Sequence, residues 1–319
     1  MSENTMSQPS GFGKFMMAAR AYSFPASIIP ILLGSVLAIV LNPELSFNYL
    51  NFFVALVGAI LVQVATNVIN DIYDYKKGID KEDKELGIPH GGSMVLSMGV
   101  LNIKQMWNMA IITLLLSVVC GVYLYLQAGV WILYLTGFGF FSAIFYTAKP
   151  FALKYKALGD IQVILSFGVG MTLGAYIVQT GQFSWYPLLF SIPVGLLIDA
   201  ILHSNNIRDI NFDGKFGVKT LPILIGEKAS IVFYYFLILG AYLSLVIFVI
   251  LGLLPWPALL ALVTLPIGLK LIKMIGGIPQ EPQARFEYGT KHIIMTAQLN
   301  MQFGLTLIIG LMIAYFVLL

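Results

Sequence analysis

Two short stretches of the chain concentrate asparagine and aspartate, residue types well suited to binding a hard metal ion. The first runs over residues 67–80, where Asn67, Asp71 and Asp74 follow one another at spacings of four and three residues. On an α-helix this spacing places all three side chains on one face. Because Mg²⁺ takes oxygen ligands of this kind, the first stretch is predicted to form one wall of a metal site.

The second stretch runs over residues 205–222 and repeats the pattern. If the helix there continues beyond Arg208, then Asn206, Asp209 and Asp213 again share one face. Glycine and lysine follow the acidic residues in both stretches, which hints at an internal duplication. Two walls of matching geometry indicate a single site between them.

Such a pair of walls favours the binding of a diphosphate. Mg²⁺ commonly takes one or two carboxylates from the protein and completes its coordination with substrate phosphates. Two facing carboxylate clusters could therefore hold Mg²⁺ ions bridged by a diphosphate, while nearby Lys and Arg neutralise the remaining phosphate charge. The alternative is that acidic residues at helix ends simply face water, and the matching of two stripes argues against it. The predicted metal ligands are Asn67, Asp71, Asp74, Asp209 and Asp213.

The elements that must position these residues are membrane helices. Of the 319 residues, 59% are hydrophobic and 10% are charged, whereas a typical soluble domain has about 25% charged residues. A soluble protein would still have to wet its outer surface, so the bilayer is the remaining solvent. The net charge of +3 gives no indication of a nucleic-acid partner, and a single cysteine, Cys120, excludes a disulfide framework.

Nine stretches are apolar over the roughly 20 residues that a membrane-spanning helix needs. They predict an all-α, polytopic protein with nine transmembrane helices in a bundle around a central cavity. The predicted spans cover residues 15–41, 49–75, 105–127, 129–147, 158–180, 186–207, 229–252, 256–275 and 293–319.

The basic residues support this count and orient the helices. All 18 Lys and Arg residues fall in the N-terminal region or around the connections after the second, fourth, sixth and eighth spans. By the positive-inside rule, the N-terminus and the long connections face the cytoplasm. This predicts a multi-pass protein of the inner (cytoplasmic) membrane with its active-site mouth on the cytoplasmic side. Residues 1–13 are polar and are predicted to be a disordered tail, whereas residues 14–319 form one transmembrane domain.

At the two acidic stretches the chain resembles the UbiA superfamily of intramembrane prenyltransferases. That family carries an Asn-Asp-x-x-Asp motif after its second helix and an Asp-x-x-x-Asp motif after its sixth, on a nine-helix bundle. Residues 70–74 and 209–213 match these motifs, and the resemblance covers nearly the whole chain.

A narrower resemblance points to the 1,4-dihydroxy-2-naphthoate polyprenyltransferases of menaquinone synthesis. The chain departs from the superfamily pattern at Gly78, where a third aspartate is common, although Asp80 follows as in the naphthoate branch. It departs from that branch at residues 90–96, which replace an Arg-containing stretch. The segments similar to the naphthoate branch are residues 19–27, 70–80, 146–150, 158–160 and 205–222.

The resemblance implies Mg²⁺-dependent transfer of a polyprenyl group from polyprenyl diphosphate to an aromatic acceptor, within the lipid bilayer. Mg²⁺ on the four motif aspartates would draw charge off the leaving diphosphate, and the electron-rich ring would attack the allylic cation in a dry cavity. Arg20 is expected to pair with a carboxylate of the acceptor or to act as a membrane anchor. The expected substrate-binding residues are Arg20, Asn67, Asn70, Tyr146, Lys149, Lys154, Asn206, Arg208, Lys215 and Lys219.

Asp199 and His203 are further catalytic candidates, because they lie four residues apart inside the sixth predicted span. Ionisable groups within a membrane are costly and mark function by default. They are expected to orient the hydroxyls of the acceptor or to remove a ring proton. The alternative is that the two side chains form a structural pair that satisfies itself.

Other functions stay open at this point. Within the enzyme class, the acceptor could be 4-hydroxybenzoate, homogentisate or a lipid glycerol, or the protein could be a terpene cyclase that uses no acceptor. From another class, an ion-coupled transporter is the main rival. Transporters place charged residues near the middle of the membrane at broken helices, whereas here the acidic stretches gather at one face.

Overall fold

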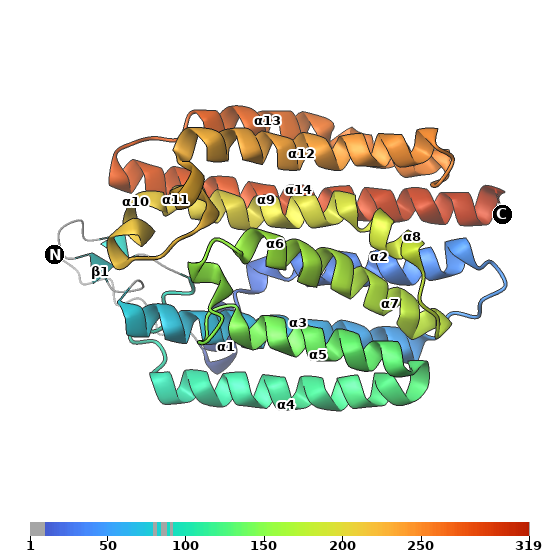
Figure 1. Cartoon of the computed structure of the whole chain (residues 1–319), viewed down its shortest axis with the longest axis horizontal. Helices are drawn as coiled ribbons and strands as arrows, with labels where there is room; N and C mark the ends of the chain where they lie inside the picture. The colour runs from blue at the N-terminus through green and yellow to red at the C-terminus, as the bar shows by residue number, and fades with distance from the viewer. Residues whose placement is uncertain (1–9, 79–81, 84–87, 90–91, 319) are drawn as a thin grey trace.

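A computed structural model describes residues 10–78, 82–83, 88–89 and 92–318. Its helices run along one common axis and form an elongated bundle (Figure 1). The N-terminal half comprises α1 (Gly11–Ala18), η1 (Ala21–Ser23), α2 (Pro25–Leu41), α3 (Tyr49–Lys77), β1 (Glu82–Asp83), β2 (Ile88–Pro89), α4 (Ile103–Ala128), α5 (Val130–Phe145) and η2 (Leu153–Tyr155). Strands β1 and β2 pair antiparallel in the connection between α3 and α4.

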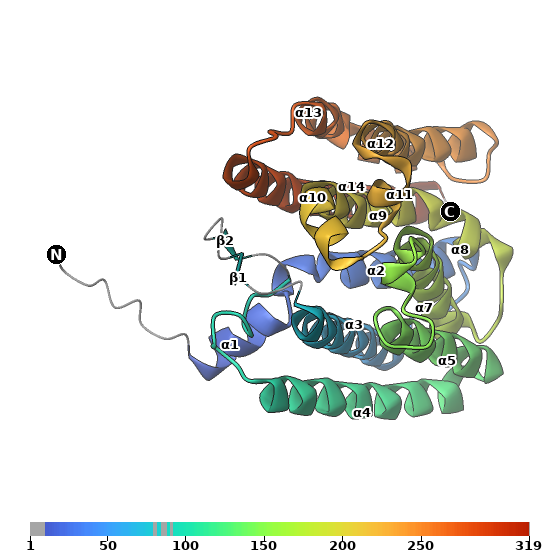
Figure 2. The ribbon, with the colours of Figure 1, turned by 60° about the vertical axis from the view of Figure 1, so that its left-hand side comes forward.

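The second half begins with a continuous helical stretch that contains a π-helical segment, η3. It comprises α6 (Gly159–Val163), η3 (Ile164–Gly170), α7 (Met171–Thr180), α8 (Trp185–Phe190), α9 (Ile192–Arg208), α10 (Ile210–Asp213), η4 (Gly214–Phe216), α11 (Leu221–Ile225), α12 (Glu227–Ile250), η5 (Trp256–Thr264), α13 (Leu265–Gly276) and α14 (Pro282–Leu318). Both ribbon views place α12 and α13 on one side of the bundle and α4 on the opposite side (Figures 1 and 2).

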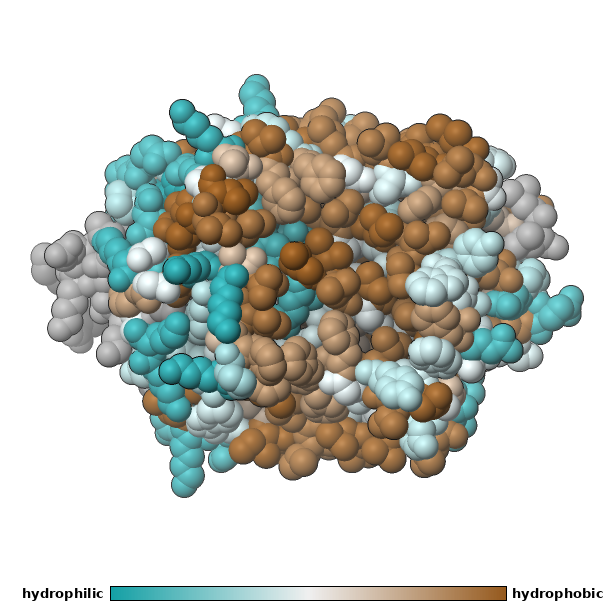
Figure 3. Space-filling view, viewed as in Figure 1, coloured by the Kyte–Doolittle hydropathy of each residue, from teal (hydrophilic) through white to brown (hydrophobic). Residues whose placement is uncertain are grey.

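The described residues contain eight helical stretches long and apolar enough to cross a membrane. The fourth predicted span appears as α5, which has 16 residues and is about 24 Å long, shorter than the roughly 30 Å of bilayer hydrocarbon. The all-helical, multi-pass membrane architecture is therefore confirmed, whereas the count of nine complete spans stays a prediction. Apolar side chains cover the middle of the molecule, and polar ones gather mainly toward its two ends (Figure 3).

The structure departs from the predicted boundaries at two places. The first predicted span is broken, because Arg20 adopts a left-handed conformation with φ of 52° and separates α1 from η1 and α2. Helix α14 starts at Pro282, before the predicted residue 293, and so carries polar residues at one end. The predicted tail overlaps α1 over residues 11–13, and residues 1–9 lie outside the described part of the chain.

Close helix packing holds the bundle together. A Cβ atom at Gly34 of α2 would lie 2.1 Å from the carbonyl oxygen of Thr172, and one at Gly310 of α14 would lie 2.1 Å from that of Pro257. Small residues allow such approaches between membrane helices. These contacts fix α2 against α7 and α14 against η5, and they leave the space between α3, α5 and η3 as the place for a cavity.

Candidate active site

The first acidic stretch forms the last turns of α3. Asp71 and Asp74 are each 2% exposed, so both carboxylates point into the protein rather than into water. Gly78 ends the helix with φ of 85°, a left-handed conformation that favours glycine. The helical spacing of the stretch therefore places its acidic residues as predicted.

Asp71 is held by two segments that are distant in the sequence. Arg20 forms an ion pair with one carboxylate oxygen. The backbone N–H of Ser93 donates to the other oxygen at 3.2 Å, and the Ser93 hydroxyl donates to it as well. At Gly92 a Cβ atom would collide with the guanidinium of Arg20, so the loop needs glycine there to close over this pair.

Asp74 is held from the connection between α5 and α6. The Lys154 ammonium lies 2.5 Å from Oδ2 of Asp74 and donates to Asn70 Oδ1 at 3.1 Å. Tyr155 donates its hydroxyl to Oδ1 at 2.6 Å. Burial, the largest single effect, lowers the pKa of Lys154, but Asp74, Tyr146 and Asp213 together outweigh it and raise the pKa above its ordinary value. Lys154 is therefore a fixed positive charge at this point.

The second acidic stretch contributes Asp209 and Asp213 from the end of α9 and from α10. Arg208 donates to both oxygens of Asp209, at 2.7 Å from Nε and 2.6 Å from Nη2. Gly289 of α14 makes room for the Arg208 side chain, because a Cβ atom there would lie 2.5 Å from Arg208 Cγ. Burial, followed by the charge of Asp209, raises the pKa of Asp213 to about 7.

The structure brings the two stretches together. A small polar pocket of about 60 Å³ lies between them. Its walls include Asp74 from one stretch and Asp209 and Asp213 from the other, and Arg20, Lys154 and Arg208 line it as well. The facing carboxylate walls and their basic partners therefore border one space.

This donor set fits Mg²⁺ only together with a substrate. Within the described part of the chain, no three Asp, Glu, His or Cys side chains are close enough to hold one ion among them. Mg²⁺ does not require such a cage, because it is commonly bound by one or two carboxylates plus phosphate oxygens and water. If Mg²⁺ binds here, the carboxylates that would hold it are those of Asp71, Asp74, Asp209 and Asp213.

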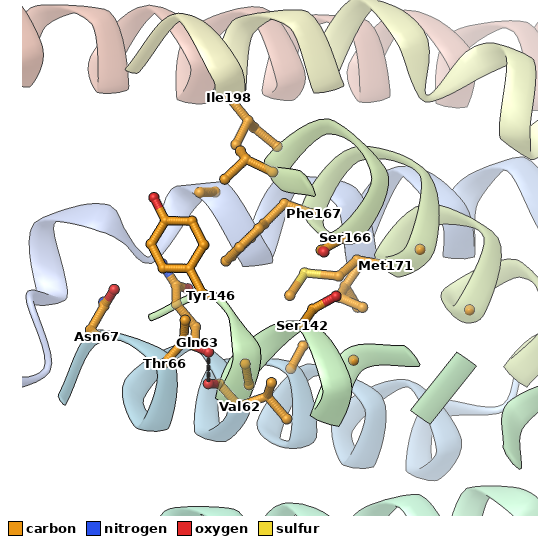
Figure 4. A pocket seen from close by; sticks show the side chains of 18 of the residues that line it. Val62, Gln63, Thr66, Asn67, Ser142, Tyr146, Ser166, Phe167, Met171 and Ile198 are labelled. Atoms are coloured by element: carbon orange, nitrogen blue, oxygen red, sulfur yellow. Dashed lines mark hydrogen bonds between the residues drawn. The ribbon is translucent and has the colours of Figure 1, made fainter. Parts of the chain in front are cut away.

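A larger cavity of about 320 Å³ continues from this polar pocket into the membrane-spanning part of the bundle. Arg20, Asn70 and Lys154 line both spaces, so they mark the junction. Below it the walls become apolar, with Tyr146, Phe167 and Met171 pointing into the space shown in Figure 4. Among the described residues that line this cavity, none is Asp, Glu or His.

Comparison with known proteins assigns the family of this chain. Residues 27–288 match the UbiA prenyltransferase family.

The chain belongs to the UbiA prenyltransferase family.

Two relatives illustrate the range of this similarity. UbiA prenyltransferase domain-containing protein 1 of Danio rerio is 33% identical over 302 residues, which cover 94% of this chain and 84% of the relative. The 1,4-dihydroxy-2-naphthoate octaprenyltransferase of Bacillus subtilis (strain 168) is 31% identical over 314 residues, which cover 98% of this chain and 96% of the relative. Since both comparisons span nearly the whole chain, the family similarity is not confined to the acidic motifs.

A solved structure supports the fold. The UbiA homolog of Archaeoglobus fulgidus, bound to GPP and Mg²⁺, has a TM-score of 0.63 and 16% sequence identity, and the match covers 92% of this chain and 99% of that one. At this identity the comparison establishes the shared UbiA fold. Together with the family match, it makes the chain a membrane prenyltransferase.

Of the other predicted substrate-binding residues, some line the larger cavity and some do not. Asn67, Asn206 and Tyr146 line it, and Asn67 also donates to the Ala19 carbonyl at 3.0 Å. Lys149, Lys215 and Lys219 are exposed and line neither pocket. The structure therefore does not bring these three lysines to the site.

Asp199 and His203 are fully buried on α9 but do not line the cavity. His203 pairs with Asp160 through Nδ1 at 2.7 Å, and its Nε2 lies 3.1 Å from the Ser230 carbonyl oxygen. The mutual Asp199–His203 pair, given above as the alternative, is thus not formed, because His203 pairs with Asp160 between α6 and α9.

Three residues that hold the carboxylates escaped the sequence reasoning. Ser93 and Gly92 fall in a stretch that was notable only for departing from the naphthoate branch, and Tyr155 adjoins a predicted lysine. A hydroxyl residue next to a predicted lysine or a glycine is too common a pattern to indicate that it donates to a motif carboxylate. Only the folded structure shows that Ser93 and Tyr155 donate to Asp71 and Asp74.

Proposed function

We propose that this protein transfers a polyprenyl group from its diphosphate to 1,4-dihydroxy-2-naphthoate, with loss of the acceptor's carboxylate as CO₂. One observation carries the transfer reaction: two facing carboxylate walls, each with its own basic partner, stand at the polar end of a mainly apolar cavity. A diphosphate suits the charged end, and a polyprenyl chain suits the apolar remainder. The charged end is proposed to face the cytoplasm.

Bound Mg²⁺ would supply Lewis-acid stabilisation of the negative charge on the departing diphosphate. The residues proposed to hold it are Asp71, Asp74, Asp209 and Asp213. Lys154 and Arg208 now neutralise Asp74 and Asp209. When these carboxylates bind the metal, the two basic side chains are free to donate to diphosphate oxygens, where charge develops as the carbon–oxygen bond breaks.

The cavity walls protect the allylic cation that this cleavage leaves. Phe167, Met171 and Ile198 line the space, and side chains of this kind exclude water that would capture the cation. An aromatic ring with two hydroxyl groups is electron-rich enough to attack the cation instead. The new carbon–carbon bond therefore forms inside the cavity, while diphosphate leaves toward the polar pocket.

The lining of the cavity also supports the choice of acceptor. Attack through a ring carbon that bears hydrogen requires a base to remove that proton. Attack through a carboxylated carbon expels CO₂, and the bonding electrons return to the ring, so no base is needed. Among the described lining residues none is Asp, Glu or His, which favours the second course. Arg20 lies at the junction of the two spaces and is proposed to hold the acceptor's carboxylate before transfer.

The direct test is a competition among acceptors in detergent. Purified protein receives geranylgeranyl diphosphate with equal amounts of 1,4-dihydroxy-2-naphthoate, 4-hydroxybenzoate and homogentisate, and products are read by mass spectrometry with Mg²⁺ or with EDTA. The proposal expects the prenylated naphthol without its carboxylate, and only with Mg²⁺. A preference for 4-hydroxybenzoate, or a product that retains the carboxylate, contradicts the proposed acceptor. Full activity in EDTA contradicts the metal–diphosphate chemistry.

A further inference from the structure

A cluster of hydrogen bonds, here called the floor, borders the lower end of the large cavity. There Asn51 of α3 donates to the carbonyl of Val178 in α7 at 3.4 Å, and Tyr123 of α4 donates to Asn51 Oδ1 at 3.1 Å. The side chain of Gln179 bonds the backbone of Asn48 in both directions, at 2.9 and 3.1 Å. These bonds tie three helices together directly below Ala55 and Val178, which line the cavity.

The depth of the cavity can be measured along α3. From Asn67, near the junction, to Ala55 above the floor is twelve residues, or about 18 Å at about 1.5 Å per residue. Carbon–carbon bonds of about 1.5 Å let an extended four-bond isoprene unit advance about 5 Å. The space below Asn67 therefore accepts about three units in line.

Small residues line the lower chamber. This chamber is the part of the cavity lined by Ala55, Gly58, Cys120, Gly121, Leu124, Ile132, Gly174 and Val178. A Cβ atom at Gly58 would lie 3.1 Å from Cys120 Cβ, and one at Gly121 would lie 2.9 Å from a Thr136 carbon. At Gly174 it would meet only Leu135, at 3.7 Å, so a longer side chain there has room to enter the cavity.

We propose that this lower chamber binds the third isoprene unit of the donor and so makes the enzyme favour donors of at least three units. Gly58 lies about 14 Å below Asn67 along α3, and Cys120 of α4 lies beside it; the first two units do not span this depth. The proposal rests on the proposed function, because it assumes that the cavity holds the prenyl chain. It adds a minimum donor length and names the wall that sets it.

Cys120 provides a reporter, because it is the one cysteine in the sequence and lines this chamber. The intact protein is incubated with Mg²⁺ and saturating thiodiphosphate analogues of one, two, three or four isoprene units. Cys120 is then converted to its methyl disulfide with methyl methanethiosulfonate, which releases methanesulfinate, and the rate is followed by intact mass. Binding of each analogue is measured separately, by its inhibition of prenyl transfer and by thermal shift.

The expected result is a step in protection. Analogues of one and two units should bind yet leave the rate of Cys120 modification within about twofold, whereas those of three and four units should slow it at least tenfold. Equal protection by the one-unit analogue, or none by the bound four-unit analogue, overturns the length proposal and leaves the proposed function intact. If no analogue binds at all, the proposed function itself fails.

Substitutions give a second test that does not depend on the reactivity of the thiol. Gly174→Leu should lower the preference for geranylgeranyl over geranyl diphosphate at least tenfold. Gly139→Leu, higher on the cavity wall, should impair both donors, because a Cβ atom there meets open space. Gly137→Leu is the matched control, since Gly137 is exposed on the same helix and lies outside the cavity lining. An unchanged donor preference in correctly folded Gly174→Leu protein overturns the proposal.

Discussion

Lys154 offers a quantitative test of how the site balances its charges. Its ammonium lies 2.5 Å from the nearly buried Asp74 carboxylate, and 15% of the lysine side chain is exposed. Removing one partner of a buried ion pair costs about 3–5 kcal/mol, because the other charge is left uncompensated. Lys154→Gln keeps a polar side chain, and Tyr155 still donates to Asp74. We therefore expect Lys154→Gln to lower the free energy of unfolding by about 3 kcal/mol, near the lower bound of that range.

Mg²⁺ should reverse part of this loss. If Asp74 is a metal ligand, the divalent ion with a bound diphosphate analogue supplies the positive charge that the variant lacks. The assay is thermal unfolding in detergent, in EDTA and then with Mg²⁺ and the analogue. Lys149→Gln is the matched control, since Lys149 is exposed and lines neither pocket. The reasoning is refuted if Lys154→Gln is as stable as the wild type in EDTA, or if Mg²⁺ and the analogue restore none of its stability.

Three further predictions concern the acidic walls and the orientation of the helices. Asp71→Asn and Asp209→Asn should each lower turnover about 100-fold or more, because each removes a group that stabilises charge in the transition state; steady-state kinetics on folded variants measure this, and near-normal turnover in both would sink the metal assignment. The pKa of Asp213 is raised to about 7, so its neutral form is favoured in the folded state and the stability it contributes is lost as pH rises from about 4 to 7. Melting temperatures in EDTA should therefore fall over this range more in the wild type than in Asp213→Asn, and parallel curves would contradict the burial argument. Cysteines introduced near Pro43 and Lys215, in a Cys120→Ser background, should react with an impermeant reagent from opposite sides of the membrane, and reaction from one side would reject the topology.

The local geometry of the first acidic stretch could be predicted, because it depends only on helical spacing. Asn67, Asp71 and Asp74 share a face of α3, as their spacing requires. The second stretch could be predicted only conditionally, since α9 ends at Arg208 and α10 follows it. The short turn keeps Asp209 and Asp213 on the same pocket.

The partners of these carboxylates could not be predicted from spacing. Arg20 reaches Asp71 across 51 residues of sequence, and Lys154 reaches Asp74 across 80. For the same reason the four-residue spacing of Asp199 and His203 could not reveal that His203 pairs with Asp160 from another helix. Helical periodicity specifies which side chains share a face, and only the assembled bundle specifies what that face meets.

The shape of the cavity also could not be predicted from the sequence. An apolar composition predicted that a bundle would form, and the basic residues placed its charged end. The floor depends on Asn51 and Gln179, polar residues at helix ends that had no distinguishing pattern. The π-helical segment η3, which lies against the cavity, likewise has no periodic signal.

One measurement tests the central claim most directly. The protein is incubated with geranylgeranyl diphosphate, Mg²⁺ and 1,4-dihydroxy-2-naphthoate labelled with ¹³C at the carboxyl carbon, and the prenylated product and the labelled CO₂ are quantified together. Decarboxylative prenyl transfer predicts equal molar amounts of both, with the label absent from the product and both signals abolished by EDTA. Prenylated product that keeps the label, or labelled CO₂ released without prenylated product, would contradict the claim.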